Sequence, residues 1–146
     1  MDKGFFSASA DFTVEFYDVD SMRIVWHGNY IKYFELGRCA LLDEIGFGYA
    51  EMAKSGYAWP VVDVRVKYIR PLVFHQKARI VATLLEYENR LRIAYRIIDP
   101  ETGAVLTKGE STQMAVEVST LTSCFTSPEC LLAPVRAYLE KSGGNQ

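Results

Sequence analysis

Apolar residues recur with a helical period between residues 29 and 47, in the sequence NYIKYFELGRCALLDEIGF. On a helical wheel they cover most of the circumference and leave only a narrow polar strip. Asn29 stands where an N-cap is expected, and Gly46 and Gly48 are typical of a helix end. The pattern therefore predicts one long helix that is mostly buried and that other elements must surround.

Alternating apolar and polar residues predict strands on both sides of this helix. A short strand is expected before it, over residues 13–17. Four strands are expected after it, over residues 59–71, 78–88, 90–99 and 104–118. A bulge is expected in the last strand at Gly109. Beyond the strands, residues 127–141 are expected to form a terminal helix.

The order of these elements predicts an α+β domain, with a curved antiparallel sheet wrapped around one long central helix. Residues 1–146 are expected to form a single domain, with a core of about residues 12–118 and a C-terminal extension over residues 119–146. The sheet should have exposed edges and one solvated face rich in arginine and valine. Exposed edges of this kind favour association of two or more copies.

Composition narrows the classes of protein to be considered. The 146 residues carry a net charge of −2 with a pI of about 5.7, which does not favour a nucleic-acid-binding protein. Three cysteines without a CxxC motif predict reduced thiols and neither a disulfide framework nor a zinc site. We expect no secretory leader and no membrane span, and therefore a cytoplasmic protein.

Residues 17–30, YDVDSMRIVWHGNY, fit neither a strand nor a helix period. They place two aspartates and a histidine between a predicted strand and the predicted helix. The segment resembles the hotdog-fold acyl-CoA thioesterases of the 4-hydroxybenzoyl-CoA thioesterase type, and the resemblance extends over residues 13–118. The positions that match the family pattern are Asp18, Asp20, Val25, Trp26, His27, Asn29, Tyr30, Phe34, Glu35 and Arg38.

The resemblance implies hydrolysis of acyl-CoA or acyl-carrier-protein thioesters by a homodimer or homotetramer, with no metal or redox cofactor. It identifies Asp20, the second aspartate of the motif, as the catalytic acid. It also assigns the polarisation of the thioester carbonyl to the backbone at His27 and Gly28. The chain departs from the family pattern after Asp20, because Ser21, Met22 and Arg23 replace the small residues that are common there.

The residue types suit this chemistry. The leaving thiol has a pKa near 8.5, so a carboxylate can either attack the thioester or activate a water molecule. The start of a helix offers unpaired N–H groups, and Gly28 allows close approach to that backbone. Asp20 can therefore act as nucleophile or as general base, whereas Asp18 is expected to have a structural role.

Other interpretations of the same residues stay open. Glu35 on the helix is the second candidate for the catalytic carboxylate. His27 and Glu35 together are also typical of a hotdog dehydratase, and the fold also occurs in non-catalytic acyl-thioester-binding proteins. His27 alone can orient Asp20 or a water molecule, or can serve only as a hydrogen-bonded structural residue.

Substrate contacts are expected at a further set of residues. Cations on the strands can bind the phosphates of coenzyme A, although charged residues on a sheet face are more often only solvated. A narrow apolar channel is needed for the pantetheine arm, and Tyr57, Trp59 and Val62 are candidates for it. The residues expected to contact substrate are Tyr17, Asn29, Val62, Arg65, Lys67 and Arg92.

Overall fold

The computed structural model describes residues 4–143 of the chain. The strands are β1 (Ser7–Thr13), β2 (Tyr57–Ala58), β3 (Val61–Tyr68), β4 (Lys77–Glu86), β5 (Leu91–Ile98), β6 (Val105–Gln113), β7 (Val116–Glu117) and β8 (Thr122–Ser123). The helices are α1 (Tyr30–Glu44), α2 (Tyr49–Lys54) and α3 (Glu129–Gly143), with two 3-10 turns, η1 (Phe16–Asp18) and η2 (His27–Asn29).

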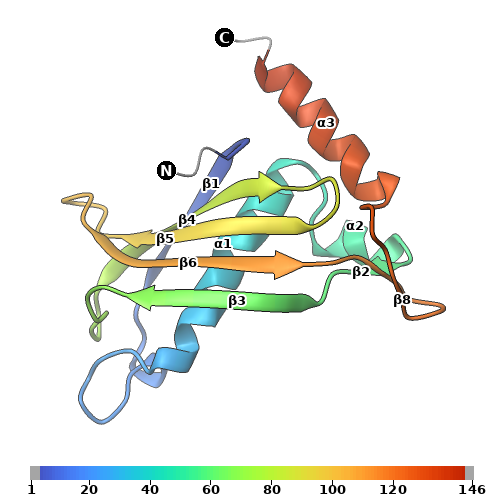
Figure 1. Cartoon of the computed structure of the whole chain (residues 1–146). Helices are drawn as coiled ribbons and strands as arrows, with labels where there is room; N and C mark the ends of the chain where they lie inside the picture. The colour runs from blue at the N-terminus through green and yellow to red at the C-terminus, as the bar shows by residue number, and fades with distance from the viewer. Residues whose placement is uncertain (1–3, 144–146) are drawn as a thin grey trace.

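Five antiparallel strands form the main sheet in the order β1-β4-β5-β6-β3, and β2, β7 and β8 form a smaller sheet. Figure 1 shows α1 lying across one face of the main sheet, with β1 and β3 at its two edges. β3 pairs with β6 and not with β4, which follows it in the chain. The expected α+β arrangement, a curved antiparallel sheet around one long helix, is confirmed.

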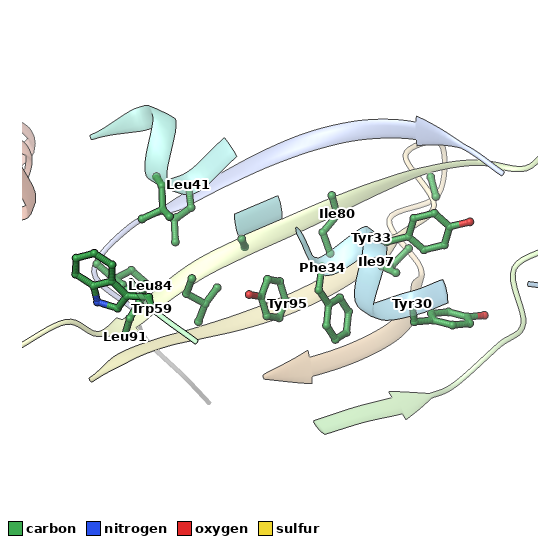
Figure 2. Close-up of a cluster of buried hydrophobic side chains, with 14 of the residues drawn as sticks. Tyr30, Tyr33, Phe34, Leu41, Trp59, Ile80, Leu84, Leu91, Tyr95 and Ile97 are labelled. Carbon is green, nitrogen blue, oxygen red and sulfur yellow. The ribbon is translucent and has the colours of Figure 1, made fainter. Parts of the chain in front are cut away.

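The core lies between α1 and the sheet. In Figure 2, Phe34 of α1 lies beside the strand residues Tyr95 and Ile80. The Phe34 and Tyr95 rings stack with centroids 4.4 Å apart and an angle of 3° between their planes. Both side chains are at most 2% exposed. The strand expected over residues 90–99 is confirmed by β5. Its alternate apolar side chains are all buried in this core, namely Leu91, Ile93, Tyr95 and Ile97.

Gly109 explains why α1 can approach β6 so closely. A Cβ atom at this position would come within 2.3 Å of the Phe34 ring. The residue is paired regularly with Tyr95 on one side and Val66 on the other. The bulge expected at Gly109 is therefore wrong. The irregularity in the pairing of β5 with β6 lies instead between Ile97 and Ile98.

The expectation that α1 is mostly buried is only half correct. One face of the helix is buried against the sheet, whereas Ile31 and Leu36 remain 43% and 42% exposed. The periodicity identified the helix correctly, but five strands cover a single side of it. The opposite side of α1 is therefore a partly apolar surface.

The first strand lies earlier in the sequence than expected. β1 covers Ser7–Thr13 and pairs with β4 along its whole length, whereas residues 16–18 form the turn η1. The expected strand over residues 13–17 is therefore wrong. Phe16, which the alternation placed in a strand, is 72% exposed.

The expected terminal helix is confirmed by α3. Leu131 and Val135 are fully buried in the core. The Tyr138 hydroxyl donates a hydrogen bond to Glu44 Oε2 at 3.1 Å, and its ring packs against Phe6 with centroids 4.4 Å apart. The C-terminal extension thus packs against the end of α1, at Glu44, and against Phe6, which directly precedes β1. Within residues 4–143, no helix has the length and apolar character needed to cross a membrane.

Candidate active site

A tight loop between η1 and η2 carries Asp20. The Asp20 N–H donates to the Ile24 carbonyl at 2.9 Å, and the Arg23 N–H donates to the Asp20 carbonyl at 2.9 Å. Arg23 has a φ of 64°, in the left-handed region that favours glycine. Glycine-sized residues are common there in the family pattern, and the loop accepts arginine at the cost of backbone strain.

The Asp20 side chain is exposed at the surface of this single chain. Its Oδ1 atom accepts a hydrogen bond from the Met22 N–H at 2.8 Å. This bond orients the carboxylate within the loop. The second carboxylate oxygen of Asp20 has no protein donor among the described residues. This oxygen is therefore free to contact a ligand or a water molecule.

Asp18 holds both ends of the loop together. Its carbonyl oxygen accepts hydrogen bonds from the Trp26 N–H at 3.0 Å and from the Asn29 side-chain amide at 2.8 Å. Its carboxylate pairs with Lys32 on α1 and accepts the Glu15 N–H at 3.0 Å. One buried residue therefore links the entry of the loop, its exit and the first turns of α1. The structural role expected for Asp18 is consistent with these contacts.

The electrostatics of Asp18 follow from this environment. Burial by itself would raise the pKa of the Asp18 carboxyl group, but hydrogen bonds from Lys32 and from the Glu15 N–H outweigh burial and hold the pKa below its usual value. Burial also raises the pKa of the neighbouring Tyr33 hydroxyl, and the Asp18 carboxylate raises it further. Asp18 is thus a carboxylate, and Tyr33 a neutral phenol, at neutral pH.

We expect Lys32→Met to destabilise the protein by about 1–2 kcal/mol at pH 7, because the buried Asp18 carboxylate loses its cationic partner. The pKa of Asp18 is lowered in the folded state. The ion pair therefore stabilises the protein at pH values above the unfolded pKa of about 4. This stabilisation is lost as the pH falls through the folded pKa. Urea unfolding of the variant and the wild type at pH 7 and at acidic pH measures the difference. Lys77→Met is the control, since Lys77 is an exposed lysine with no carboxylate partner within residues 4–143. A loss of stability that stays constant across this pH range would contradict the role of the pair.

The start of the helix offers free backbone donors. η2 leads directly into α1, so the helical segment begins after Trp26. Within residues 4–143, no protein oxygen accepts a hydrogen bond from the His27 or Gly28 N–H. This is the usual state of the first N–H groups of a helix, which makes them available to a developing negative charge.

Asn29 directly precedes α1, at the expected N-cap position, but its side chain does not cap the helix. Asn29 has helical backbone angles (φ −75°, ψ −14°), and its side chain makes no capping bond. The reason is that η2 extends the helical segment three residues upstream, to His27, with Trp26 at the N-cap position. The Asn29 side chain instead binds the Asp18 carbonyl, so this residue braces the loop.

A pocket of about 210 Å³ lies beside this helix start. His27, Tyr30 and Tyr68 line it together with Ile24 and Arg70. The Tyr68 hydroxyl donates to the His27 carbonyl at 3.0 Å, which joins the end of β3 to η2. Asp20 belongs to the same loop but does not line this pocket in the single chain.

The residues expected to contact substrate do not gather in one place. Tyr17 is exposed beside Lys32, and Asn29 lies at the loop. Val62 lies at the opposite end of β3 from Tyr68 and is 56% exposed. The remaining three expected residues, Arg65, Lys67 and Arg92, lie on the strands.

Two of these three cations are neutralised by acids. Arg65 pairs with Asp63 at 3.5 Å, and Arg92 pairs with Glu110 at 2.9 Å. Lys67 has no carboxylate within 4.0 Å in the described part of the chain. Within residues 4–143, Lys67 is therefore the expected phosphate-binding cation that has no acidic partner.

Sequence reasoning missed three residues of the site. Lys32 lies on the polar strip of the helix, near its start. A cation so soon after a loop with two aspartates could have indicated an ion pair with one of them. Tyr68 and Arg70 lie at the end of an apparently ordinary predicted strand, and their proximity to His27 results from the pairing of β3 at the sheet edge. Within residues 4–143, no group of three or more His, Cys, Asp or Glu side chains is arranged to hold a metal ion.

The chain is similar in sequence and in fold to several known proteins. A family model described as the thioesterase-like superfamily matches residues 14–135. A protein of Bacillus subtilis (strain 168) with the name "Putative acyl-CoA thioesterase YneP" is 36% identical over 106 residues, which are 71% of this chain and 75% of that protein. Among solved structures, a DHNA-CoA thioesterase from Staphylococcus aureus aligns with a TM-score of 0.81 at 23% identity, over 94% of this chain and 91% of that one. A 1,4-dihydroxy-2-naphthoyl-CoA thioesterase from Synechocystis aligns with a TM-score of 0.79 at 13% identity, over 92% and 96% of the two chains.

Proposed function

Because the chain belongs to the thioesterase-like superfamily and is a thioesterase of the hotdog fold, we propose that it hydrolyses acyl-CoA thioesters with Asp20 as the reacting carboxylate. The family match covers most of the chain, as the resemblance of residues 18–38 led us to expect. The names of the sequence relative and of the structural neighbours favour coenzyme A over a carrier protein as the thiol component.

One observation carries the proposal: free amides and a carboxylate share one braced loop. The N–H groups of His27 and Gly28 have no acceptor within residues 4–143, and they lie at the start of a continuous helical segment. Asp20 lies in the loop that leads into these amides. Asp18 ties the two ends of that loop together through its hydrogen bonds with Trp26 and Asn29.

In the proposed reaction the thioester carbonyl oxygen accepts hydrogen bonds from the His27 and Gly28 N–H groups. These donors stabilise the negative charge that develops on the oxygen, and losing one such donor typically costs about 10²-fold in rate or more. The Asp20 carboxylate either attacks the carbonyl carbon to form an anhydride or removes a proton from an attacking water molecule. In both cases the carbon–sulfur bond breaks and coenzyme A leaves as the thiolate.

We expect purified protein to release free thiol from acyl-CoA substrates. A panel of benzoyl-, short-, medium- and long-chain acyl-CoAs, followed with a thiol-reactive chromophore, measures this activity and ranks the acyl groups. The same acyl groups on a carrier protein form the comparison set. Absence of thiol release from every member of both sets would contradict the proposal, and loss of water from a 3-hydroxyacyl substrate would indicate a dehydratase instead.

We further propose that two copies pair through β3 and complete each other's site. β3 is an edge strand of eight residues whose outer side has no partner strand within residues 4–143. Antiparallel pairing of β3 with itself would bring Val61 and Val62 of the second copy close to Tyr68 of the first. Tyr68 contacts His27, so the apolar end of the second β3 would cover the exposed loop around Asp20. This arrangement gives Val62 a place beside the acyl group.

We expect Val62→Lys to shift the protein from dimer to monomer and to lower kcat/KM, because a charge at the paired edge opposes strand association. Sedimentation velocity at micromolar concentrations measures the assembly, and the thiol-release assay measures activity. Ser9→Lys places the same charge on β1, at the opposite edge of the sheet, and is expected to leave both unchanged. A wild-type protein that is monomeric and fully active would contradict the shared site.

A further inference from the structure

The face of the sheet opposite α1 carries a row of three cations. Arg96 on β5 and Lys108 on β6 are direct register partners, and Lys108 is in turn the register partner of Lys67 on β3. All three side chains are exposed. Neighbouring strands lie about 4.8 Å apart, so the row spans about 10 Å of backbone. In Figure 1 this part of the sheet, where β5, β6 and β3 run side by side, is not covered by α1, which lies behind it.

This row of cations does not stabilise the fold, because like charges directly opposite each other on neighbouring strands lower the stability of a sheet. In the described part of the chain none of the three has a carboxylate within 4.0 Å. The other arginines of this face are neutralised by acids. They are Arg65 with Asp63 at 3.5 Å, Arg79 with Asp11 at 2.6 Å, and Arg92 with Glu110 at 2.9 Å.

A groove of about 690 Å³ adjoins the row. Arg96 and Lys108 line it, together with the hydroxyl groups of Ser7 and Thr83, which hydrogen-bond to each other at 2.7 Å. Ala94 contributes a small side chain to its lining. The volume lies within the range of about 300–1,000 Å³ that is typical of sites for small organic ligands. It is larger than the pocket of about 210 Å³ beside His27.

The chemistry of this groove suits a phosphorylated organic anion. A guanidinium group can bind two phosphate oxygens at once, and an ammonium group supplies a mobile charge beside it. Hydroxyl groups donate further hydrogen bonds, and the small apolar lining leaves room for an organic body. We propose that this groove binds a nucleotide-type phosphate ester, with Arg96 and Lys108 as its phosphate ligands and Lys67 at its margin. The site lies on the face of the sheet opposite α1 and does not depend on hydrolysis by Asp20.

The test is isothermal titration calorimetry of the full chain at low ionic strength, with ADP and with coenzyme A as probes. We expect at least one of them to bind, and to bind at least 10-fold more weakly to the double variant Arg96→Gln, Lys108→Gln. Binding should also weaken as salt is added. Arg79→Gln is the matched control, since it removes an acid-paired arginine from the same face and should leave binding unchanged. The single variant Lys108→Gln, expected to weaken binding in the same direction, serves if the double variant does not fold.

Two sources of the ligand are separated by kinetics. If the groove binds the nucleotide portion of the substrate, the double variant raises KM for acyl-CoA and leaves kcat nearly unchanged. If the groove binds a free nucleotide, the double variant loses ADP binding while its KM for acyl-CoA stays as in the wild type. Asp20→Asn should retain binding in either case, which separates this proposal from the catalytic one. The proposal is overturned if neither probe binds the wild type, or if the changes at Arg96 and Lys108 leave binding intact. It is also overturned if the protein forms a larger oligomer that buries the groove between copies.

Discussion

Asp20→Asn is expected to lower kcat for acyl-CoA hydrolysis by about 10³-fold, because an amide can neither attack the thioester nor accept a proton from water. Asparagine keeps the oxygen that accepts the Met22 N–H, so the loop should retain its conformation. The thiol-release assay with the best acyl-CoA of the panel measures the effect. Thermal unfolding should be unchanged within about 2 °C, which corresponds to less than about 1 kcal/mol for a domain of this size.

Glu35→Gln is the matched control, because it makes the same chemical change at the other candidate carboxylate. Glu35 is 58% exposed in its side chain and pairs with Arg38 at 3.5 Å. It also lies eight residues after His27, which is about 12 Å along a helix axis. We expect its kcat to stay within about 3-fold of the wild type, as for a surface ion pair. Loss of activity in Glu35→Gln together with normal turnover in Asp20→Asn would transfer the catalytic role to the helix.

Phe34→Ala is expected to be the most destabilising of the single changes considered, at about 3–5 kcal/mol, because it empties the space between α1 and the sheet. Phe34 is 2% exposed, stacks on Tyr95 and fills the space that Gly109 leaves free. A loss of this size corresponds to about 10 °C in Tm for a chain of this length. Urea and thermal unfolding at neutral pH measure it directly.

Leu36→Ala is the control on the same helix, since Leu36 is 42% exposed on the opposite face. Its cost in unfolding free energy should stay below about 1 kcal/mol. Equal losses in the two variants would mean that both faces of α1 are buried in solution, for example by a second copy. The pair of variants therefore also tests how much of the helix the assembled protein covers.

The fold was accessible from the sequence wherever one face of an element is apolar. Leu91, Ile93, Tyr95 and Ile97 alternate in β5 and are all buried. β1 was placed too late because Ser7–Thr13 is rich in serine and alanine, which give a weak strand signal. Its position is set by pairing with β4, about 70 residues later, and local sequence does not contain that information.

The sequence motif led us to propose the residues of the candidate site, but not the contacts that support them. The motif indicated Asp20 and the amides of His27 and Gly28, whereas the Lys32 contact with Asp18 depends on the 3-10 turn that precedes α1. The cation row was hidden for a different reason. Lys67 and Lys108 are neighbours only because β3 pairs with β6, and the order of the strands along the chain gives no sign of it.

The bracing of the loop by Asp18 has a consequence for how such enzymes diversify. Both ends of the loop are tied through this residue, and Val19 and Val25 bridge just above it. The tip, with Ser21, Met22 and Arg23, lies between these ties, so its side chains can change in size and charge while both ends of the loop stay in place. We therefore expect this tip to tolerate substitution during evolution, because such changes leave the contacts of Asp18 intact.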